Sequence, residues 1–322
     1  MVCAPGVCCE DTQCTALGNG TNTCTNGQCS CVGRCLTEFP LPTADAKPSS
    51  IVLGPDGNMW FTEANAHKIG RITPAGVITE FPVTTTAQSI GPIVAVGGVL
   101  WFAESNSGEL GMITTEGVIS HVTQMDPTLV QGISADAAGN IWHTGFNNTV
   151  VRVVPGGAQT AFTLPTPNAA PKWIAPGPDN TMWALENNAS KAARIAADGA
   201  ITEYPLTDNA GPQAMALGPD GNFWITFGNG LGMGKLTPQG VYSVVNLPFD
   251  QSYGAGIVLG DDNALWYGAG IGNSVIRLAV DGTTTVFPVP TPSARLSGFA
   301  KGADGSIWFT EEDGNKIGHL SN

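Results

Sequence analysis

Gly54-Pro55-Asp56-Gly57-Asn58-Met59-Trp60-Phe61-Thr62-Glu63 is the stretch of sequence that decides the fold. Asp-Gly between apolar residues is typical of a tight hairpin turn, and the apolar residues after it predict a short strand. The pattern recurs, because seven of the eight tryptophans are spaced by 41, 41, 41, 41, 42 and 42 residues, at Trp60, Trp101, Trp142, Trp183, Trp224, Trp266 and Trp308. A fixed period of this length indicates a repeat architecture.

Each repeat predicts four short strands and no helix. The tryptophan strand is followed by an Asn-rich loop, a strand such as 69–73, a glycine-containing turn and a last strand such as 78–82. Four strands in about 41 residues make one propeller blade. We therefore expect an all-β, seven-bladed β-propeller over residues 36–322. Residues 36–40 read as a fourth strand and residues 317–320 as a third, so the first strand should complete the last blade and close the ring.

All eight cysteines lie in residues 1–35, which we treat as a separate segment. They are Cys3, Cys8, Cys9, Cys14, Cys24, Cys29, Cys31 and Cys35. A segment this short cannot bury enough apolar surface to fold alone, so the even number of cysteines predicts a disulfide framework of open connectivity. A zinc site is the alternative, although the segment has no histidine and no clean pair of CxxC units. Disulfides indicate an extracellular, secreted or periplasmic location.

The charge balance excludes two classes of partner. The formal net charge is −13, from 13 Lys and Arg against 26 Asp and Glu, and no basic cluster occurs. Nucleic acids and anionic membrane surfaces are bound through such clusters. No apolar run reaches the ~20 residues of a membrane span. We expect a small-molecule or protein ligand at a propeller face.

Two positions in each repeat are expected to face the same mouth of the central channel. The first, at the start of the innermost strand, is occupied by Ser49, Gly91, Gln131, Lys172, Gln213, Ala255 and Ser297. The second, three or four residues after the tryptophan, is occupied by Glu63, Glu104, Gly145, Glu186, Phe227, Ala269 and Glu311, with Glu312 beside it. Several carboxylates at one mouth could hold Mg²⁺ or Ca²⁺. They could instead be hydrogen-bonded between blades or solvated, with Lys172 and Arg295 compensating their charge.

With flanking segments such as Lys68-Ile69-Gly70-Arg71-Ile72 and Ile78-Thr79-Glu80-Phe81-Pro82, the repeats resemble the virginiamycin B lyase (streptogramin lyase) family over residues 36–322. The resemblance implies a seven-bladed propeller. It also implies an elimination that opens cyclic depsipeptides at the ester with Mg²⁺. In such a reaction a base removes the proton α to a carbonyl, while a metal and an acid stabilise the developing charge.

The residues that the family places at the mouth are mostly replaced in this chain. By repeat alignment the family's tyrosine falls on Ser49 and one histidine on Ala255, and its Glu-x-His falls on Arg295-Leu296-Ser297. Only the glutamate of the last repeat has a match, at Glu312. The chain has four histidines. We expect His67 in a loop on the mouth side, His121 in an outermost strand, His143 in the core and His319 on the surface of a strand.

Three functions follow as hypotheses. The first is a secreted binding or interaction module that has the lyase scaffold without the lyase chemistry. The second is a Mg²⁺-dependent carbon–oxygen lyase, or a lactone hydrolase, in which Glu311, Glu312 or Glu63 is the base and Glu311 and Glu312 also hold the metal. The third is an extracellular structural or assembly subunit.

Overall fold

The computed structural model describes most of the chain. The described residues are 34–84, 89–105, 109–123, 130–145, 148–206, 211–228, 232–247, 256–269 and 273–322, and the backbone alone of 22–25 and 28–31. In the cysteine segment, β1 (Asn22–Thr25) pairs antiparallel with β2 (Gln28–Cys31). Apart from Cys35, the cysteine side chains lie outside the described residues, so the disulfide framework stays a prediction.

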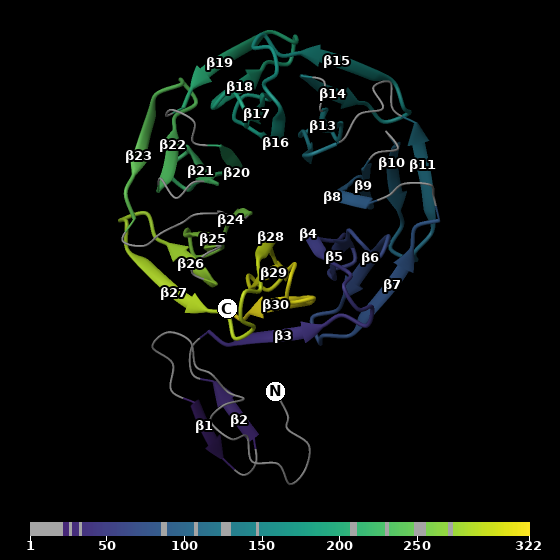
Figure 1. Ribbon diagram of the computed structural model, residues 1–322, viewed down its shortest axis with the longest axis vertical. Coiled ribbons are helices and arrows are strands. Elements are labelled where there is room, and N and C mark those ends of the chain that lie inside the picture. The colour runs from purple at the N-terminus through teal and green to yellow at the C-terminus, as the bar shows by residue number, and fades with distance from the viewer. Residues whose placement is uncertain are drawn as a thin grey trace.

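Seven four-stranded antiparallel sheets surround a central channel, as predicted (Figure 1). Blade 1 is β4 (Pro48–Leu53), β5 (Met59–Glu63), β6 (Lys68–Ile72) and β7 (Ile78–Pro82). Blade 2 is β8 (Ser89–Val96), β9 (Val99–Ser105), β10 (Glu109–Ile113) and β11 (Ile119–Thr123). Blade 3 is β12 (Ile133–Ala135), β13 (Ile141–Gly145), β14 (Thr149–Val153) and β15 (Gln159–Thr163). Blade 4 is β16 (Pro171–Pro176), β17 (Met182–Glu186), β18 (Lys191–Ile195) and β19 (Ile201–Pro205).

The remaining blades follow the same order from the channel outward. Blade 5 is β20 (Pro212–Leu217), β21 (Phe223–Phe227), β22 (Met233–Leu236) and β23 (Tyr242–Val245). Blade 6 is β24 (Ile257–Leu259), β25 (Leu265–Ala269), β26 (Ser274–Leu278) and β27 (Thr284–Pro288). Blade 7 is β28 (Leu296–Lys301), β29 (Ile307–Glu311), β30 (Lys316–Leu320) and β3 (Leu36–Pro40). Among the described residues no helix is long and apolar enough to cross a bilayer.

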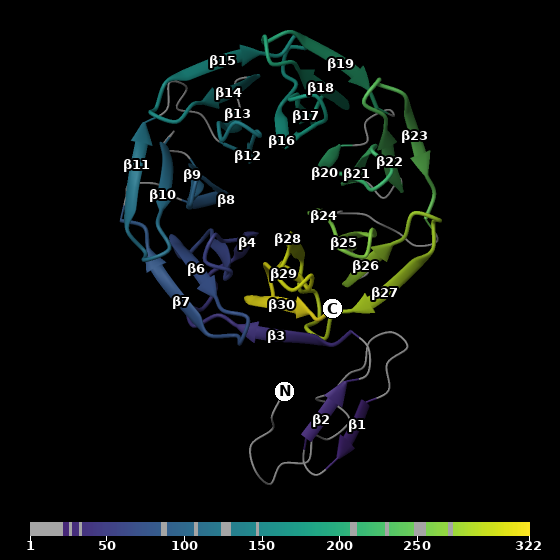
Figure 2. The ribbon, with the colours of Figure 1, turned by 180° about the vertical axis from the view of Figure 1, so that it is seen from behind.

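The ring closes through β3, which joins the two ends of the propeller. This strand pairs antiparallel with β30 from Leu36 opposite Leu320 to Pro40 opposite Lys316 (Figures 1 and 2). The Lys316 Nζ donates to Glu38 Oε2 at 2.6 Å, and the Phe39 ring stacks on Trp308 with centroids 5.9 Å apart. The predicted closure is therefore confirmed, and it pairs strand edges that would otherwise be open.

The periodic tryptophans fill the space between blades, and in six of the seven blades described the indole N–H group donates to a residue of the preceding turn. Trp60 is fully buried, and its Nε1 donates to Asp56 Oδ1 at 3.0 Å while Asn58 Nδ2 donates to Asp56 Oδ2 at 2.7 Å. The same Asp–Trp bond occurs in blades 3, 5 and 6, whereas Thr181 and Ser306 are the acceptors in blades 4 and 7. The aspartate of the turn is thus a structural residue.

Replacing Asp56 with alanine is expected to lower the free energy of unfolding by about 1–3 kcal/mol, because a buried indole N–H loses its acceptor. Denaturant unfolding of Asp56→Ala beside Asp56→Asn measures the effect. Asparagine keeps a side-chain oxygen and should cost less, so equal losses in the two variants would contradict this role for the carboxylate.

Candidate functional site

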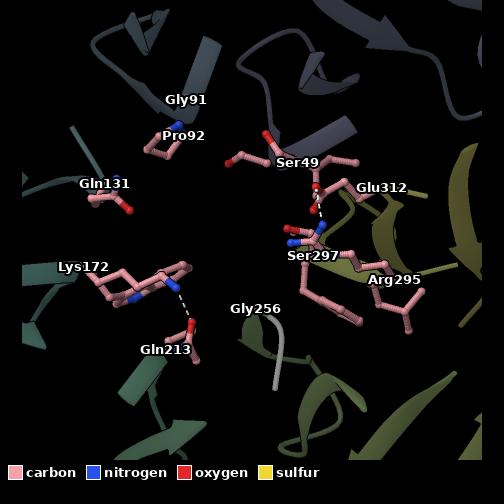
Figure 3. Close-up of a pocket in the computed structure, with 18 of the residues that line it drawn as sticks. Ser49, Gly91, Pro92, Gln131, Lys172, Gln213, Gly256, Arg295, Ser297 and Glu312 are labelled. Carbon is pink, nitrogen blue, oxygen red and sulfur yellow. Dashed lines mark hydrogen bonds and ion pairs between the residues drawn. The ribbon is translucent and has the colours of Figure 1, made fainter. Parts of the chain in front are cut away.

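A cavity of about 1060 Å³ occupies one end of the central channel. The starts of the innermost strands line it, and Figure 3 shows their side chains around a common centre. Six residues of the first predicted set lie there: Ser49, Gly91, Gln131, Lys172, Gln213 and Ser297. The seventh, Ala255, lies outside the described residues, and its neighbour Gly256 lines the cavity.

β-Bulges position these side chains. The pairing of the innermost strand with the second strand shifts between Pro48 and Ile51, and again between Pro171 and Trp173, so Ser49 and Lys172 lie inside the irregular stretch. Blades 2, 5 and 7 have a shift at the same place. A bulge bends its strand and re-aims side chains, which is why the mouth residues leave the regular pleat.

Buried threonines of the second strand hold the bulged backbone. Thr62 Oγ1 accepts from the Ser50 N–H at 3.2 Å, and Thr310 Oγ1 accepts from the Gly298 N–H at 2.8 Å. Because an unpaired buried N–H is costly, these hydroxyls stabilise the mouth geometry. A threonine two residues after the tryptophan could have indicated this role from the sequence, because Thr62 and Thr310 share that position.

Lys172 and Arg295 give the cavity two cationic groups. The Lys172 Nζ donates to Gln213 Oε1, and Gln213 Nε2 in turn donates to the Gly211 carbonyl at 3.1 Å (Figure 3). Burial and then the charge of Arg295 lower the pKa of Lys172. Arg295, held at a φ of 51°, places its Nη1 3.1 Å from Glu312 Oε1. Burial raises the pKa of Glu312, and the charge of Arg295 opposes that rise.

Apolar and amide groups complete the wall. Trp173 lies against the cavity, and its indole Nε1 donates to the Met215 carbonyl at 3.0 Å. The remaining lining includes several residues that sequence analysis did not predict, namely Ile51, Ile93, Ile133, Phe299, Asn273, Ser293 and Asp313. A mixed surface with a few fixed polar groups is typical of small-molecule sites.

The second predicted set does not lie at the mouth, which corrects the expectation from the sequence. Glu63, Glu104, Glu186 and Glu311 are fully buried, and none of them lines the cavity. Each lies at or next to the end of its second strand, opposite the first residue of the third strand, so its side chain lies on a sheet face shared with the outer strands. Only Glu312, one residue beyond its strand, reaches the cavity.

Three of these buried carboxyls adjoin the same arrangement of outer residues, which we call the Thr–Lys–Glu strap. In blade 1 the Lys68 Nζ is 2.6 Å from both Glu80 Oε2 and Thr43 Oγ1, and the Thr43 N–H donates to Glu80 Oε1 at 3.0 Å. Blade 4 repeats it with Lys191, Glu203 and Thr166, and blade 7 with Lys316, Glu38 and Thr291. Burial, followed by repulsion from the strap glutamate, raises the pKa of Glu63 to about 7 and those of Glu186 and Glu311 to about 8.

The donor set at the cavity does not suit Mg²⁺. Mg²⁺ takes oxygen ligands and is commonly anchored by carboxylates. The carboxylates among the described lining residues are Glu312, which pairs with Arg295, and Asp313, whose Oδ1 lies 2.9 Å from the Lys47 Nζ. Glu311 lies away from the cavity, and Lys172 and Arg295 would repel a divalent cation. We derive no step through a metal here.

None of the four histidines lines the cavity in the part of the chain that the structure describes. His67 lies in a loop at a φ of 53°, and His143 is fully buried. His121 on β11 pairs with Glu104, and His319 stacks on Trp308 with ring centroids 4.1 Å apart. No described histidine thus replaces the pair that the resemblance places at the mouth.

The strand order and the cavity define a seven-bladed β-propeller with a ligand-sized site at the channel mouth. The model of the virginiamycin B lyase family matches residues 20–151 and 121–322, and the chain belongs to this family. A virginiamycin B lyase of Nocardia farcinica is 30% identical over 172 residues, which are 52% of this chain and 58% of that protein. A virginiamycin B lyase of Bordetella parapertussis is 37% identical over 51 residues, 16% of this chain and 17% of that one.

Solved structures give the same assignment over most of the chain. A streptogramin B lyase structure has a TM-score of 0.84 and 29% identity, covering 89% of this chain and 97% of its own. A catalytically inactive histidine-to-alanine variant of virginiamycin B lyase from Staphylococcus aureus, solved with quinupristin, has a TM-score of 0.84 and 28% identity. That match covers 90% of this chain and 99% of the other. The curated relatives are matched over less than two thirds of their lengths.

Proposed function

We propose that this protein is a binding module outside the reducing cytoplasm. Its ligand would be small, rich in carbonyl or carboxylate oxygens and bound in the cavity without ring-opening elimination. The observation that carries the proposal is the pair of cations, Lys172 and Arg295, on a wall whose described residues include no histidine or tyrosine. Such groups hold oxygen atoms, whereas elimination also requires a base and an acid in reach of the substrate.

The size and charge of the cavity support this ligand class. A volume of about 1060 Å³ is just above the range typical of small-molecule pockets, and therefore suits a macrocycle or a short peptide. The chain as a whole carries −13, yet Lys172 has an amide partner in the cavity and pairs with no carboxylate among the described residues. An oxygen-rich ligand would take over the place of Gln213 on that ammonium.

Glu312 supports a second candidate, an elimination in which this carboxylate is the base. It lines the cavity, and burial raises its pKa toward that of a useful general base. The Arg295 ion pair counts against this role, because a cation that stabilises the carboxylate makes it a weaker base. The two candidates differ in whether bonds in the ligand are broken.

Calorimetric titration with quinupristin, followed by mass spectrometry of the recovered ligand, tests both candidates. We expect binding without ring opening, and Lys172→Met should weaken it by roughly 10–100-fold, the worth of a hydrogen bond to a charged group. Lys301→Met is the matched control, because the Lys301 Nζ pairs with Asp261 on the exposed surface.

Two results would overturn the proposal. Ring opening that Glu312→Gln abolishes would establish the lyase. Equal affinity in the Lys172→Met and Lys301→Met variants, or no binding at all, would reject the cavity as the site for this ligand class.

A further inference from the structure

Blade 2 carries a cluster of metal-ligating side chains away from the cavity. Glu104 is the last residue but one of β9, Glu109 begins β10, and His121 is on β11, three strands that lie side by side (Figure 1). Glu109 is directly opposite Glu104 on one side and Thr123 on the other, and His121 is two residues before Thr123. All three side chains therefore share one sheet face. One ligand atom from each lies within 4.8 Å of the others.

The equivalent place holds a cation in blades 1, 4 and 7. There the position of Glu109 is a lysine, and its ammonium group contacts the strap glutamate and threonine at 2.5–2.8 Å. The position of His121 is the strap glutamate itself, Glu80, Glu203 or Glu38. Blade 2 thus keeps the buried glutamate, replaces the lysine with a second carboxylate and replaces the strap glutamate with a histidine.

The three positions change together around the propeller. In blades 3, 5 and 6 none of the three positions holds an ionisable residue. The residues there are Gly145, Thr149 and Ala161 in blade 3, Phe227, Gly232 and Val244 in blade 5, and Ala269, Ser274 and Val286 in blade 6. The blades therefore carry a complete charged set or none. In blade 2 no lysine belongs to the set, because Glu109 stands at the lysine's position beside the fully buried Glu104.

We propose that blade 2 binds a divalent first-row transition-metal ion through Glu104, Glu109 and His121. Two carboxylate oxygens and one imidazole nitrogen form a donor set that suits Zn²⁺, Co²⁺ or Mn²⁺ better than Ca²⁺. The ion would take the place of the lysine ammonium of the other blades and join the three outer strands. Glu104 is buried, whereas the His121 side chain is 30% exposed, so the ion has a path from solvent. The site is independent of the proposed function, because none of its residues lines the cavity.

The test compares Co²⁺ binding to the full-length protein and to the double variant Glu109→Lys/His121→Glu. This variant recreates the charged set of blade 1, so it should fold, and it should bind one ion fewer per chain by calorimetry. The cysteine thiols and the other histidines are the same in both proteins. Any ions that they bind are therefore removed when the number of ions bound by the variant is subtracted from that of the wild type. The visible spectrum of the ion lost should show oxygen and nitrogen ligands without thiolate. His121→Ala alone should weaken this ion by about 100-fold or more, exceeding the loss typical of an outer-shell partner.

A reciprocal variant tests whether the three residues are sufficient to bind the ion in another blade. Lys68→Glu/Glu80→His transfers the set of blade 2 into blade 1, where Glu63 already occupies the place of Glu104. We expect this variant to gain one Co²⁺ ion per chain. The same number of ions in the wild type and in Glu109→Lys/His121→Glu would overturn the proposal, since His121 would then serve only as the hydrogen-bond partner of Glu104.

Discussion

Gly70→Ala is expected to lower the free energy of unfolding by about 2–3 kcal/mol, because the new methyl group would overpack the blade core. Gly70 on β6 lies opposite Phe61 on β5, and a Cβ at Gly70 would lie 2.1 Å from the Phe61 Cζ. The ring is fully buried and cannot move into solvent. Blades 2 and 7 have the same Phe–Gly pair, and in all three blades the ring occupies the space that a side chain at the glycine would need.

Blade 4 provides the matched control, because Ala184 and Ala193 occupy the same two positions. The double variant Phe61→Ala/Gly70→Ala copies that pair into blade 1. Phe61→Ala alone removes a buried ring and should cost about 3–5 kcal/mol. Urea unfolding of both single variants and of the double variant gives the coupling between the sites. We expect the alanine at position 70 to cost much less once the ring is gone. An unchanged cost would show that the loss does not come from the contact with Phe61.

Much of the fold was predictable because each level of the sequence carries the same period. The tryptophan spacing, the Asp-Gly turns and the fourth-strand sequence at Leu36–Pro40 each indicate seven blades and their closure, and the register of β3 on β30 confirms it. The first mouth set was predictable for a related reason. The start of an innermost strand lies at the channel wherever the blades are radial, and Lys172 and Gln213 follow from position alone.

The second mouth set was misplaced because position along a strand does not give the sheet face. Neighbouring residues in a strand point to opposite faces, so Thr62 holds the bulge at the mouth while Glu63 lies on the face shared with Lys68. The residues that occur together in the same repeats could have indicated on which sheet face the glutamates lie. Every repeat with a lysine five residues after its buried glutamate also has a glutamate in its outer strand, which predicts a charged cluster away from the channel.

The stability of the protein is expected to fall as the pH rises from about 5 to 9, and Glu186→Gln should remove part of that fall. Burial raises the pKa of Glu186 to about 8, whereas an unfolded chain releases the same proton near 4.5. Between these values the folded state holds more protons, so the free energy of unfolding decreases with pH. The contribution is complete below about pH 4.5 and is lost as the pH rises through about 8. A shift of this size corresponds to about 5 kcal/mol as an upper bound. Relaxation of the surroundings and water penetration are expected to reduce it to about 2–3 kcal/mol.

Unfolding by urea at pH 5 and pH 9 measures the effect, with a chelator present so that no ion bound at blade 2 contributes. Glu186→Gln keeps the shape of a neutral carboxyl, so the variant should match the wild type at pH 5 and exceed it at pH 9 by about 2–3 kcal/mol. Glu203→Gln is the control from the same cluster. Burial alone would raise the pKa of Glu203, but hydrogen bonds from Lys191 and Thr166 lower it, so this carboxylate stabilises the fold in its ionised form.

The control is therefore expected to be less stable than the wild type at both pH values, because Lys191 and Thr166 lose an ionised acceptor. The two glutamates lie in one cluster, and their opposite responses separate burial from pairing as the cause. A Glu186→Gln variant as sensitive to pH as the wild type would mean that Glu186 is ionised in the folded protein at neutral pH. Lys191 would then balance two carboxylates, and the strap would be a three-charge network instead of an ion pair beside a neutral acid.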